Sequence, residues 1–298
     1  MIKPCALQEG NRAAVIAPAG PPEQEHLKQG IRVLEDMGLE VVIGKHVYDG
    51  EDSDEKRLSD IHEAFCDPSI KAVFCANGGA GSAKLAPMID YEIIQKNPKI
   101  FWGYSDITYL LHAIHNFSDM VTFHGPMVSS DLNDEQRSTE TESSILPLLT
   151  GESYIYDSHK SPLMTLSHGT GEGRLVGGNL TLLTNGMGTP FQVNTKGAIL
   201  LIEDVAEPAF RIDAMLTHLK QAGVFESVKG VILGHFQDDP EEYEKIKEVL
   251  KDFFSDAPYP VVENFYIGHC NPNYGVPLGV QAKLTTSPPQ LIIESGVV

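Results

Sequence analysis

Short apolar segments alternate with helices of mixed polarity over the first 125 residues of the chain. Residues at helical spacing are apolar in 27–34 and in 58–65. A strand, a helix and a second strand in succession nearly always make a right-handed crossover between parallel strands. The alternation therefore predicts an α/β fold on a parallel sheet. Its strands are expected at residues 12–17, 40–43, 72–76, 99–102 and 121–123.

A second set of elements follows a region that shows no regular period. Residues 129–142 are polar and acidic, and 150–167 have no sustained pattern. Such segments are typical of domain boundaries. We expect an amino-terminal domain at 1–150, a linker at 151–164 and a smaller mixed α/β domain at 165–298. Strands are expected in it at 173–178, 198–202 and 228–233, and helices from Leu180, from Pro208 and over 240–254.

Charge and composition restrict the partners. The formal net charge is -19, which repels nucleic acid and anionic membranes at long range. No apolar run has membrane-spanning length, and residues 1–5 lack the apolar core of a signal peptide. The four cysteines are scattered without paired spacing, which indicates neither a disulfide framework nor a zinc site. We expect a cytoplasmic globular protein.

Residues 101–108 run from an apolar strand through one serine, Ser105, into an amphipathic helix. A serine on a sharp turn between strand and helix projects its hydroxyl, and the amides at the helix start face the group it attacks. This pattern predicts a nucleophile elbow. The alternative is that Ser105 only caps the helix, with Asp106 suiting the first turn. Ile107 also stands where the second glycine of a G-x-S-x-G motif belongs.

The third expected strand leads into the glycine loop, which we define as residues 77–82, with the sequence Asn-Gly-Gly-Ala-Gly-Ser. Glycines beyond the carboxyl end of a strand let backbone amides approach a ligand. A dinucleotide site fits poorly, because Lys84 takes the final small-residue position of the motif. A tight turn and a cradle for an anion or oxyanion remain equal alternatives.

Acids and histidines also follow expected strands. Glu203, Asp204 and Glu207 compete for the end of the 198–202 strand, and position favours Glu203 as the first polar group. His269 lies between a glycine and a loop rich in asparagine and proline, which suits a general base. His235 and His124 rank next. His112 and His115 are three residues apart on a helix without an acid or cysteine in register, so a metal site has little support.

These features occur in the order nucleophile, acid, base, and the chain resembles the LD-carboxypeptidase family of serine peptidases, which includes the microcin C self-immunity peptidases. Seven motifs carry the resemblance along nearly the whole chain: Ala17-Pro18, the glycine loop, Gly-Tyr-Ser-Asp-Ile-Thr at 103–108, His-Gly-Pro at 124–126, residues 173–180, Leu-Ile-Glu-Asp at 201–204, and Gly-His at 268–269.

The resemblance implies a flavodoxin-like or Rossmann-like amino-terminal domain that supplies Ser105, and a carboxyl-terminal domain that supplies Glu203 and His269. The active site then lies in the cleft between the domains. Backbone N–H groups of Gly79 and Asp106 are expected to form the oxyanion hole. The family is commonly homodimeric and needs no metal or other cofactor. Two departures affect substrate contacts: Asn77 and Ala80 stand where the family usually has arginine and tyrosine.

The expected activity is hydrolysis of the bond before the terminal D-alanine of a murein tetrapeptide, through an acyl-enzyme, in cell-wall recycling. Candidate groups for the free carboxylate of the substrate are Ser82, Arg174 and Asn179. One alternative is a microcin C-type peptidase acting on a peptidyl or aminoacyl nucleotide. Trp102, the only tryptophan, is badly placed to stack on a base, which favours murein. A two-domain binding protein without catalysis is the non-enzyme alternative.

Overall fold

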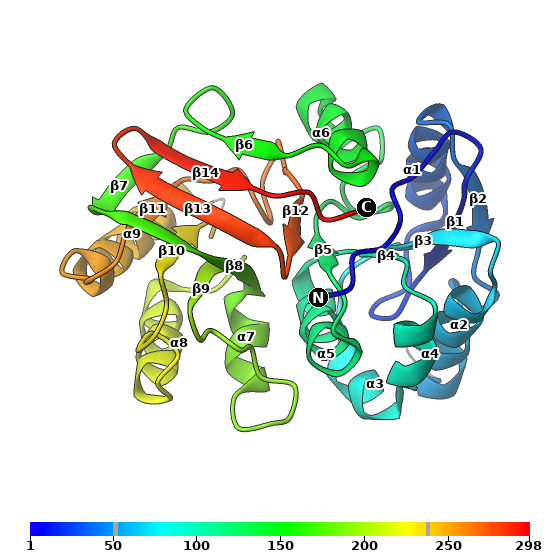
Figure 1. Ribbon diagram of the computed structural model, residues 1–298, viewed down its shortest axis with the longest axis horizontal. Helices are drawn as coiled ribbons and strands as arrows, with labels where there is room; N and C mark the ends of the chain where they lie inside the picture. Colours follow the sequence, from blue (N-terminus) through cyan, green and yellow to red (C-terminus); the bar gives the residue numbers. More distant parts are fainter. Residues whose placement is uncertain (50–52, 237–238) are drawn as a thin grey trace.

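The computed structural model describes residues 1–49, 53–236 and 239–298, and contains two β-sheets that lie side by side (Figure 1). The first sheet has six strands in the order β12-β5-β4-β3-β1-β2. All its neighbours pair in parallel except β12, which is antiparallel to β5. Its strands are β1 (Arg12–Ile16), β2 (Glu40–Ile43), β3 (Ile70–Cys75), β4 (Ile100–Trp102), β5 (Thr122–His124) and β12 (Val276–Leu278).

The helices of this half follow the predicted alternation. In α1 the buried Leu27, Ile31 and Leu34 recur at helical spacing, and the Glu23 carboxylate accepts the N–H of His26 at its start. In α2 the buried Ile61 and Phe65 lie one turn apart. The α-helices among the described residues of this half are α1 (Gln24–Asp36), α2 (Asp54–Cys66), α3 (Ser82–Leu85), α4 (Tyr91–Lys96), α5 (Thr108–Ser118) and α6 (Thr139–Thr150).

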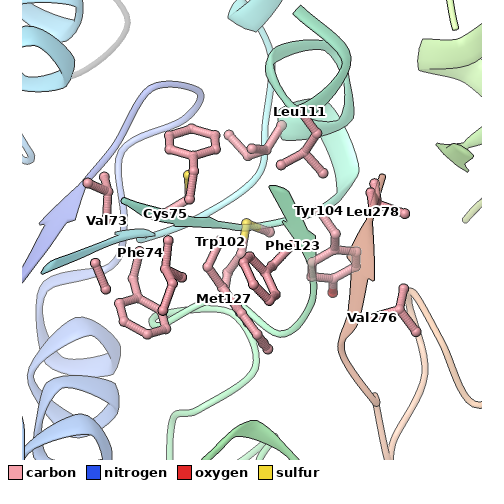
Figure 2. Close-up of a cluster of buried hydrophobic side chains, with 14 of the residues drawn as sticks. Val73, Phe74, Cys75, Trp102, Tyr104, Leu111, Phe123, Met127, Val276 and Leu278 are labelled. Carbon is pink, nitrogen blue, oxygen red and sulfur yellow. The ribbon is translucent and has the colours of Figure 1, made fainter. Parts of the chain in front are cut away.

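Trp102 lies at the centre of the core under the first sheet. Its side chain is fully buried, and its Nε1 donates to the Pro126 carbonyl over 2.7 Å. Its ring lies 5.9 Å from Phe74 and 5.8 Å from Phe123, centroid to centroid. Figure 2 shows Val276 and Leu278 of β12 beside this cluster. The carboxyl-terminal part of the chain thus completes the core of the first sheet.

The second sheet has eight strands in the order β6-β14-β13-β8-β9-β10-β11-β7. Its centre, β8 to β11, is parallel, and the strands on both sides of this centre are antiparallel. The strands are β6 (Tyr154–Tyr156), β7 (Met164–Ser167), β8 (Thr170–Asn179), β9 (Ala198–Glu203), β10 (Gly230–Leu233), β11 (Val261–Glu263), β13 (Gln281–Thr286) and β14 (Pro289–Ile293). Helices α7 (Leu180–Gly186), α8 (Ala209–Gln221) and α9 (Pro240–Phe254) complete this half.

Two segments do not fit the expected division of the chain into two domains joined by a linker. Residues 151–164, expected to be a linker, contain β6, which pairs with β14 at the edge of the second sheet. Strand β12 leaves the second half and pairs with β5, with Val276 opposite His124. Both strands have three residues, so neither carries enough periodicity to be recognised from sequence.

Helix α5 joins the two halves. His112 donates from Nε2 to the Gly177 carbonyl over 3.1 Å, and the Asn179 N–H donates to Thr108 Oγ1 over 3.2 Å. The helix that follows the predicted nucleophile is therefore bonded directly to β8. No helix within the described ranges is both long and apolar enough to cross a membrane.

Candidate active site

Ser105 lies on a strained turn directly after β4. Its φ is +60°, a left-handed backbone conformation that residues other than glycine rarely adopt. It opens a short 3₁₀ helix, Ser105–Ile107, which continues into α5. The N-cap positions of the two helices are Tyr104 and Ile107, and the Ser105 hydroxyl bonds instead to a histidine, His269. The turn therefore directs the hydroxyl away from the backbone, as a nucleophile elbow requires.

The structure brings Ser105, Glu203 and His269 together from three separate elements. Glu203 is the last residue of β9, and His269 lies on the connection between β11 and β12. His269 Nδ1 is 2.8 Å from Glu203 Oε2, and His269 Nε2 is 3.1 Å from Ser105 Oγ. Both ring nitrogens of the histidine are thus engaged, one by an acid and one by a hydroxyl. This is the arrangement in which a histidine accepts a proton from serine.

Burial and charge act in opposite directions on the acid and the base. Burial alone favours the neutral form of both groups. Burial of Glu203 is outweighed by the charge and hydrogen bond of His269, so the pKa of Glu203 lies below its ordinary value. Burial of His269 is likewise outweighed by Glu203, and the pKa of His269 is raised. The Glu203 carboxylate can therefore stabilise a protonated ring at His269.

The two neighbouring acids, Asp204 and Glu207, bond to residues other than His269. The Asp204 carboxylate accepts hydrogen bonds from Asn179 Nδ2 at 3.0 Å, from Thr181 Oγ1 at 2.9 Å and from the Val205 N–H at 2.9 Å. Burial, together with the charge of Glu203, raises the pKa of Asp204 to about 6. Glu207 pairs with Arg211 at 3.3 Å. Of the three acids weighed from sequence, only Glu203 contacts His269.

His124 lies near the site without being part of the hydrogen-bonded chain. It is fully buried, and its ring centroid is 5.5 Å from that of Tyr104. Burial lowers the pKa of His124 to about 4, so it is neutral at pH 7. His235 packs against the ring of Tyr243, with centroids 5.5 Å apart. His269 alone of these three histidines bonds to Ser105.

The glycine loop lies against the nucleophile. A Cβ on Gly78 would lie 3.1 Å from Ser105 Oγ, so a side chain there would crowd the hydroxyl. Gly79 has a φ of +127°, and a Cβ on it would lie 2.7 Å from the Gly20 nitrogen. Both positions thus need glycine for close approach. The loop's position beside Ser105 favours the oxyanion cradle over a plain turn.

The predicted oxyanion residue Asp106 is bonded to the end of this loop. Ser82 donates its N–H to Asp106 Oδ2 over 2.9 Å and its hydroxyl to the Asp106 carbonyl over 2.6 Å. Ser82 is fully buried, so its polar atoms hold the loop to the elbow. These bonds give Ser82 a structural role, and its contact with the substrate carboxylate stays a prediction.

The other two candidates for the carboxylate, Asn179 and Arg174, lie in different surroundings, and their contact with the substrate stays a prediction. Asn179 is the N-cap of α7: its Oδ1 accepts the Leu182 N–H at 3.2 Å, and its Nδ2 donates to Asp204. Arg174 lies five residues earlier on β8 and lines a separate cavity of about 630 Å³ with His115 and Lys196. At about 3.3 Å per residue, Arg174 is more than ~15 Å along the strand from Asn179.

A cavity of about 340 Å³ opens beside His269. Tyr104 forms one wall: its ring centroid is 4.8 Å from that of His269, and its hydroxyl donates to Asp131 Oδ1 over 2.8 Å. Asn273 Nδ2 donates to the same Asp131 oxygen over 3.2 Å, and Asn273 Oδ1 accepts the Gly268 N–H over 3.0 Å. These contacts fix the His269 loop.

Tyr104, Asp131 and Asn273 were not predicted as site residues. Tyr104 directly precedes Ser105 in the predicted elbow, so its position in the sequence could have identified it as a site residue. Asp131 falls in the acidic segment 129–142, which was interpreted only as a domain boundary. The cavity also has polar walls from Ser130, Gln136, Thr141 and Asn271. These groups can orient a polar substrate beside His269.

Burial lowers the pKa of both histidines of α5, His112 and His115. The pKa of His112 is lowered to about 3 by burial, and that of His115 to about 4. His112 uses Nε2 to bond Gly177, as described above. Across residues 1–49, 53–236 and 239–298, no group of three or more potential ligands gathers.

Comparisons with known proteins agree in one family. The model of the LD-carboxypeptidase N-terminal domain matches residues 13–125, and that of the LD-carboxypeptidase C-terminal domain matches 172–284. The chain is 43% identical to the probable murein peptide carboxypeptidase of Bacillus subtilis, over 99% of this chain and 95% of the relative. It is 31% identical to the murein tetrapeptide carboxypeptidase of Pseudomonas aeruginosa, over 92% of each chain.

Solved structures are similar over the same length. A MccF-like protein from Bacillus anthracis has a TM-score of 0.91 and 27% identity, and the match covers 99% of this chain and 100% of that one. The muramoyltetrapeptide carboxypeptidase of Oxalobacter formigenes has a TM-score of 0.83 and 30% identity, covering 96% of this chain and 100% of that one.

Proposed function

Because the chain belongs to the LD-carboxypeptidase family, we propose that it is a serine carboxypeptidase that removes the terminal D-alanine from murein tetrapeptides. The single observation that carries the proposal is the hydrogen-bonded chain from Ser105 Oγ through His269 to Glu203, at 3.1 and 2.8 Å. The murein substrate class is supported by the names of relatives that match over almost their full length.

The proposed reaction has two stages. His269 Nε2 takes the proton of Ser105 Oγ as the oxygen attacks the carbonyl before D-alanine, and Glu203 stabilises the charged ring. The C–N bond then breaks, and His269 gives the proton to the leaving amine of D-alanine. Water attacks the resulting ester of Ser105, with His269 again as the base. The products are the tripeptide and free D-alanine.

The oxyanion of each stage is proposed to lie against the backbone N–H groups of Gly79 and Asp106. Gly78 approaches Ser105 Oγ closely, and Asp106 directly follows the nucleophile at the start of the 3₁₀ helix. Loss of one such donor typically costs about 3 to 4 kcal/mol in the transition state. This arrangement gives the glycine loop a role that needs no nucleotide.

We also propose which half of the chain carries each catalytic residue. Residues 1–150 would form the domain that carries the nucleophile, and 165–298 the domain that carries the acid and the base. The ranges of the two family models support this division. Strand β12, which joins the first sheet, is the exception.

The peptidase of peptidyl or aminoacyl nucleotides is the second candidate, favoured by the likeness to MccF-like structures. Trp102 cannot provide a platform for a base, because it is fully buried and bonded to Pro126. A capture protein without catalysis would not need Ser105, His269 and Glu203 within hydrogen-bond distance. Both considerations support the murein carboxypeptidase.

We further propose that the enzyme works in the cytoplasm on peptides recycled from the cell wall, as a homodimer. The net charge of -19 disfavours nucleic acid and anionic membranes as partners. Light scattering of the purified protein tests the dimer: twice the chain mass of 32.6 kDa is expected, and a monomer at all concentrations contradicts it.

Substrate choice is tested with three compounds: L-Ala-γ-D-Glu-meso-diaminopimelate-D-Ala, the same peptide ending in L-alanine, and an aminoacyl adenylate analogue. We expect release of alanine from the first compound only. Cleavage of the nucleotide analogue with no release of D-alanine would instead assign the second candidate. Equal release from both tetrapeptides would contradict specificity for an L,D bond.

A further inference from the structure

We infer that Arg57 is a positioning residue for the reaction, acting by holding the glycine loop in the form that receives the oxyanion. This inference rests on the proposed function, because it takes the Gly79 N–H as an oxyanion donor. Arg57 lies in the first turn of α2, and it neither bonds to Ser105 nor lines the cavity beside His269. Its effect must therefore pass through the backbone it binds.

The Arg57 guanidinium is buried at the junction of two loops. Its side chain is 3% exposed, which is unusual for a charged group without dedicated partners. Nη1 donates to the carbonyls of Pro18 at 3.1 Å, Ala19 at 3.0 Å and Ala80 at 3.4 Å. Nη2 pairs with the Asp54 carboxylate. One cation thus joins the loop after β1 to the glycine loop after β3.

The two loops also bind each other directly. The Gly20 N–H donates to the Gly78 carbonyl over 2.8 Å. Gly81 has a φ of +109°, and a Cβ on it would lie 2.8 Å from Arg57 Nη1, so the backbone passes directly over the guanidinium. Arg57 therefore holds the glycine loop at Ala80, directly after Gly79, and holds Ala19, directly before the Gly20 that bonds to Gly78.

The carboxyl end of the glycine loop is also fixed beside the nucleophile. Ser82 makes its two hydrogen bonds to Asp106, the residue after Ser105. Gly79 lies between two of these contacts: Gly78, which lies against Ser105 Oγ, accepts the Gly20 N–H, and Ala80 accepts from Arg57. Glycines have no side chains to hold their conformation, so the direction of the Gly79 N–H depends on the contacts of its two neighbours. An oxyanion donor must be preorganised to be effective, which makes Arg57 relevant to turnover.

The test uses Arg57→Met, which removes the donors, and Arg57→Lys, which retains a cation with fewer, less directed donors. Lys99→Met is the matched control. Lys99 is also a buried cation that donates to carbonyls, those of Ala64 and Asp67, at the opposite end of the same helix. Thermal unfolding measures what each substitution costs the fold. D-alanine release then gives kcat and KM for the folded enzyme.

We expect Arg57→Met to lower kcat by about tenfold or more, with KM changed by less than about twofold. Arg57→Lys should recover part of kcat, and Lys99→Met should keep wild-type kcat even if its melting temperature falls as far. The inference is overturned if Arg57→Met and Lys99→Met lose the same fraction of kcat, or if the loss in Arg57→Met is confined to KM.

Two further measurements keep the test decisive. If Arg57→Met does not fold, Arg57→Lys and Asp54→Asn replace it, and wild-type kcat in both overturns the inference. Phosphonylation of Ser105 by a fluorophosphonate is measured on the same variants, because the probe needs an oxyanion site but no peptide. Slower labelling of Arg57→Met supports the inference even if wild type releases no D-alanine, a result that would defeat the proposed function alone. Equal labelling rates would overturn the inference.

Discussion

Replacing Glu203 with glutamine removes one charge from the buried pair with His269 and leaves the size of the side chain unchanged. The two groups are in contact, with Nδ1 and Oε2 2.8 Å apart, and Glu203 is fully buried. With the charge centres about 4 Å apart and an effective dielectric constant of about 20, their attraction is about 4 kcal/mol. At 1.36 kcal/mol for each factor of ten, we expect kcat/KM to fall by about a thousandfold.

The pH profile of activity shows in which direction Glu203 shifts the pKa of His269. His269 acts as a base only when neutral, and its pKa is raised in the wild type because, against the effect of burial, Glu203 stabilises the charged ring. Activity of the wild type should therefore be lost as pH falls through a value above that of an ordinary histidine. In Glu203→Gln, burial remains and the attraction is gone, so the pKa of His269 falls. The acid limb of the profile should move to lower pH while the plateau drops.

The assay is kcat/KM for D-alanine release across the pH range in which the enzyme stays folded, since this parameter reports the free enzyme. Asp204→Asn is the matched control, because Asp204 is the adjacent buried carboxylate and bonds to Asn179 and Thr181. Its acid limb should shift much less. An acid limb of Glu203→Gln that stays in place or moves to higher pH would refute the electrostatic role given to Glu203.

Three further predictions concern the loop, the acid stability and the core. Gly78→Ala places a methyl group 3.1 Å from Ser105 Oγ, and kcat should fall about tenfold to a hundredfold at an unchanged melting temperature; wild-type kcat would contradict the packing. Burial lowers the pKa of His112 from 6.5 to about 3, so the unfolded chain binds more protons below pH 6.5. The stability that the neutral His112 ring contributes is fully present above pH 6.5 and is lost as pH falls toward 3. Urea unfolding should show that His112→Gln reduces the loss of stability between pH 7 and pH 5 by about 2 kcal/mol; an unchanged loss would contradict it. Trp102→Ala should cost about 3 to 5 kcal/mol in the same assay, and a cost below about 1 kcal/mol would contradict its place in the core.

Local patterns were sufficient for the elements on which the site is built. The expected strands 40–43 and 198–202 and the helix 240–254 occur within a residue of their predicted bounds. Asn179 caps α7 as predicted. These features depend on residues close in sequence, where hydrophobic spacing and capping chemistry are direct signals. The parallel fold class followed from them and is confirmed.

Long-range contacts were beyond such patterns. Tyr104 is hydrogen-bonded to Asp131, which lies 27 positions away in the sequence, and Asn273 is hydrogen-bonded to Asp131 from 142 positions away. Arg57 binds the glycine loop from 23 positions away. No periodicity links such residues, because only the packing of the two sheets brings them together. The distance between Arg174 and Asn179 is a different case. It follows from sequence position alone, because Arg174 lies five residues before Asn179, the last residue of β8.

The central claim is that Ser105 forms an acyl-enzyme with a murein tetrapeptide. The most direct measurement is D-alanine release by the wild type, by Ser105→Ala and by Ser143→Ala, an exposed serine on α6 that serves as the control. We predict release by the wild type and the control, and none above background by Ser105→Ala. Undiminished release by folded Ser105→Ala would contradict the account.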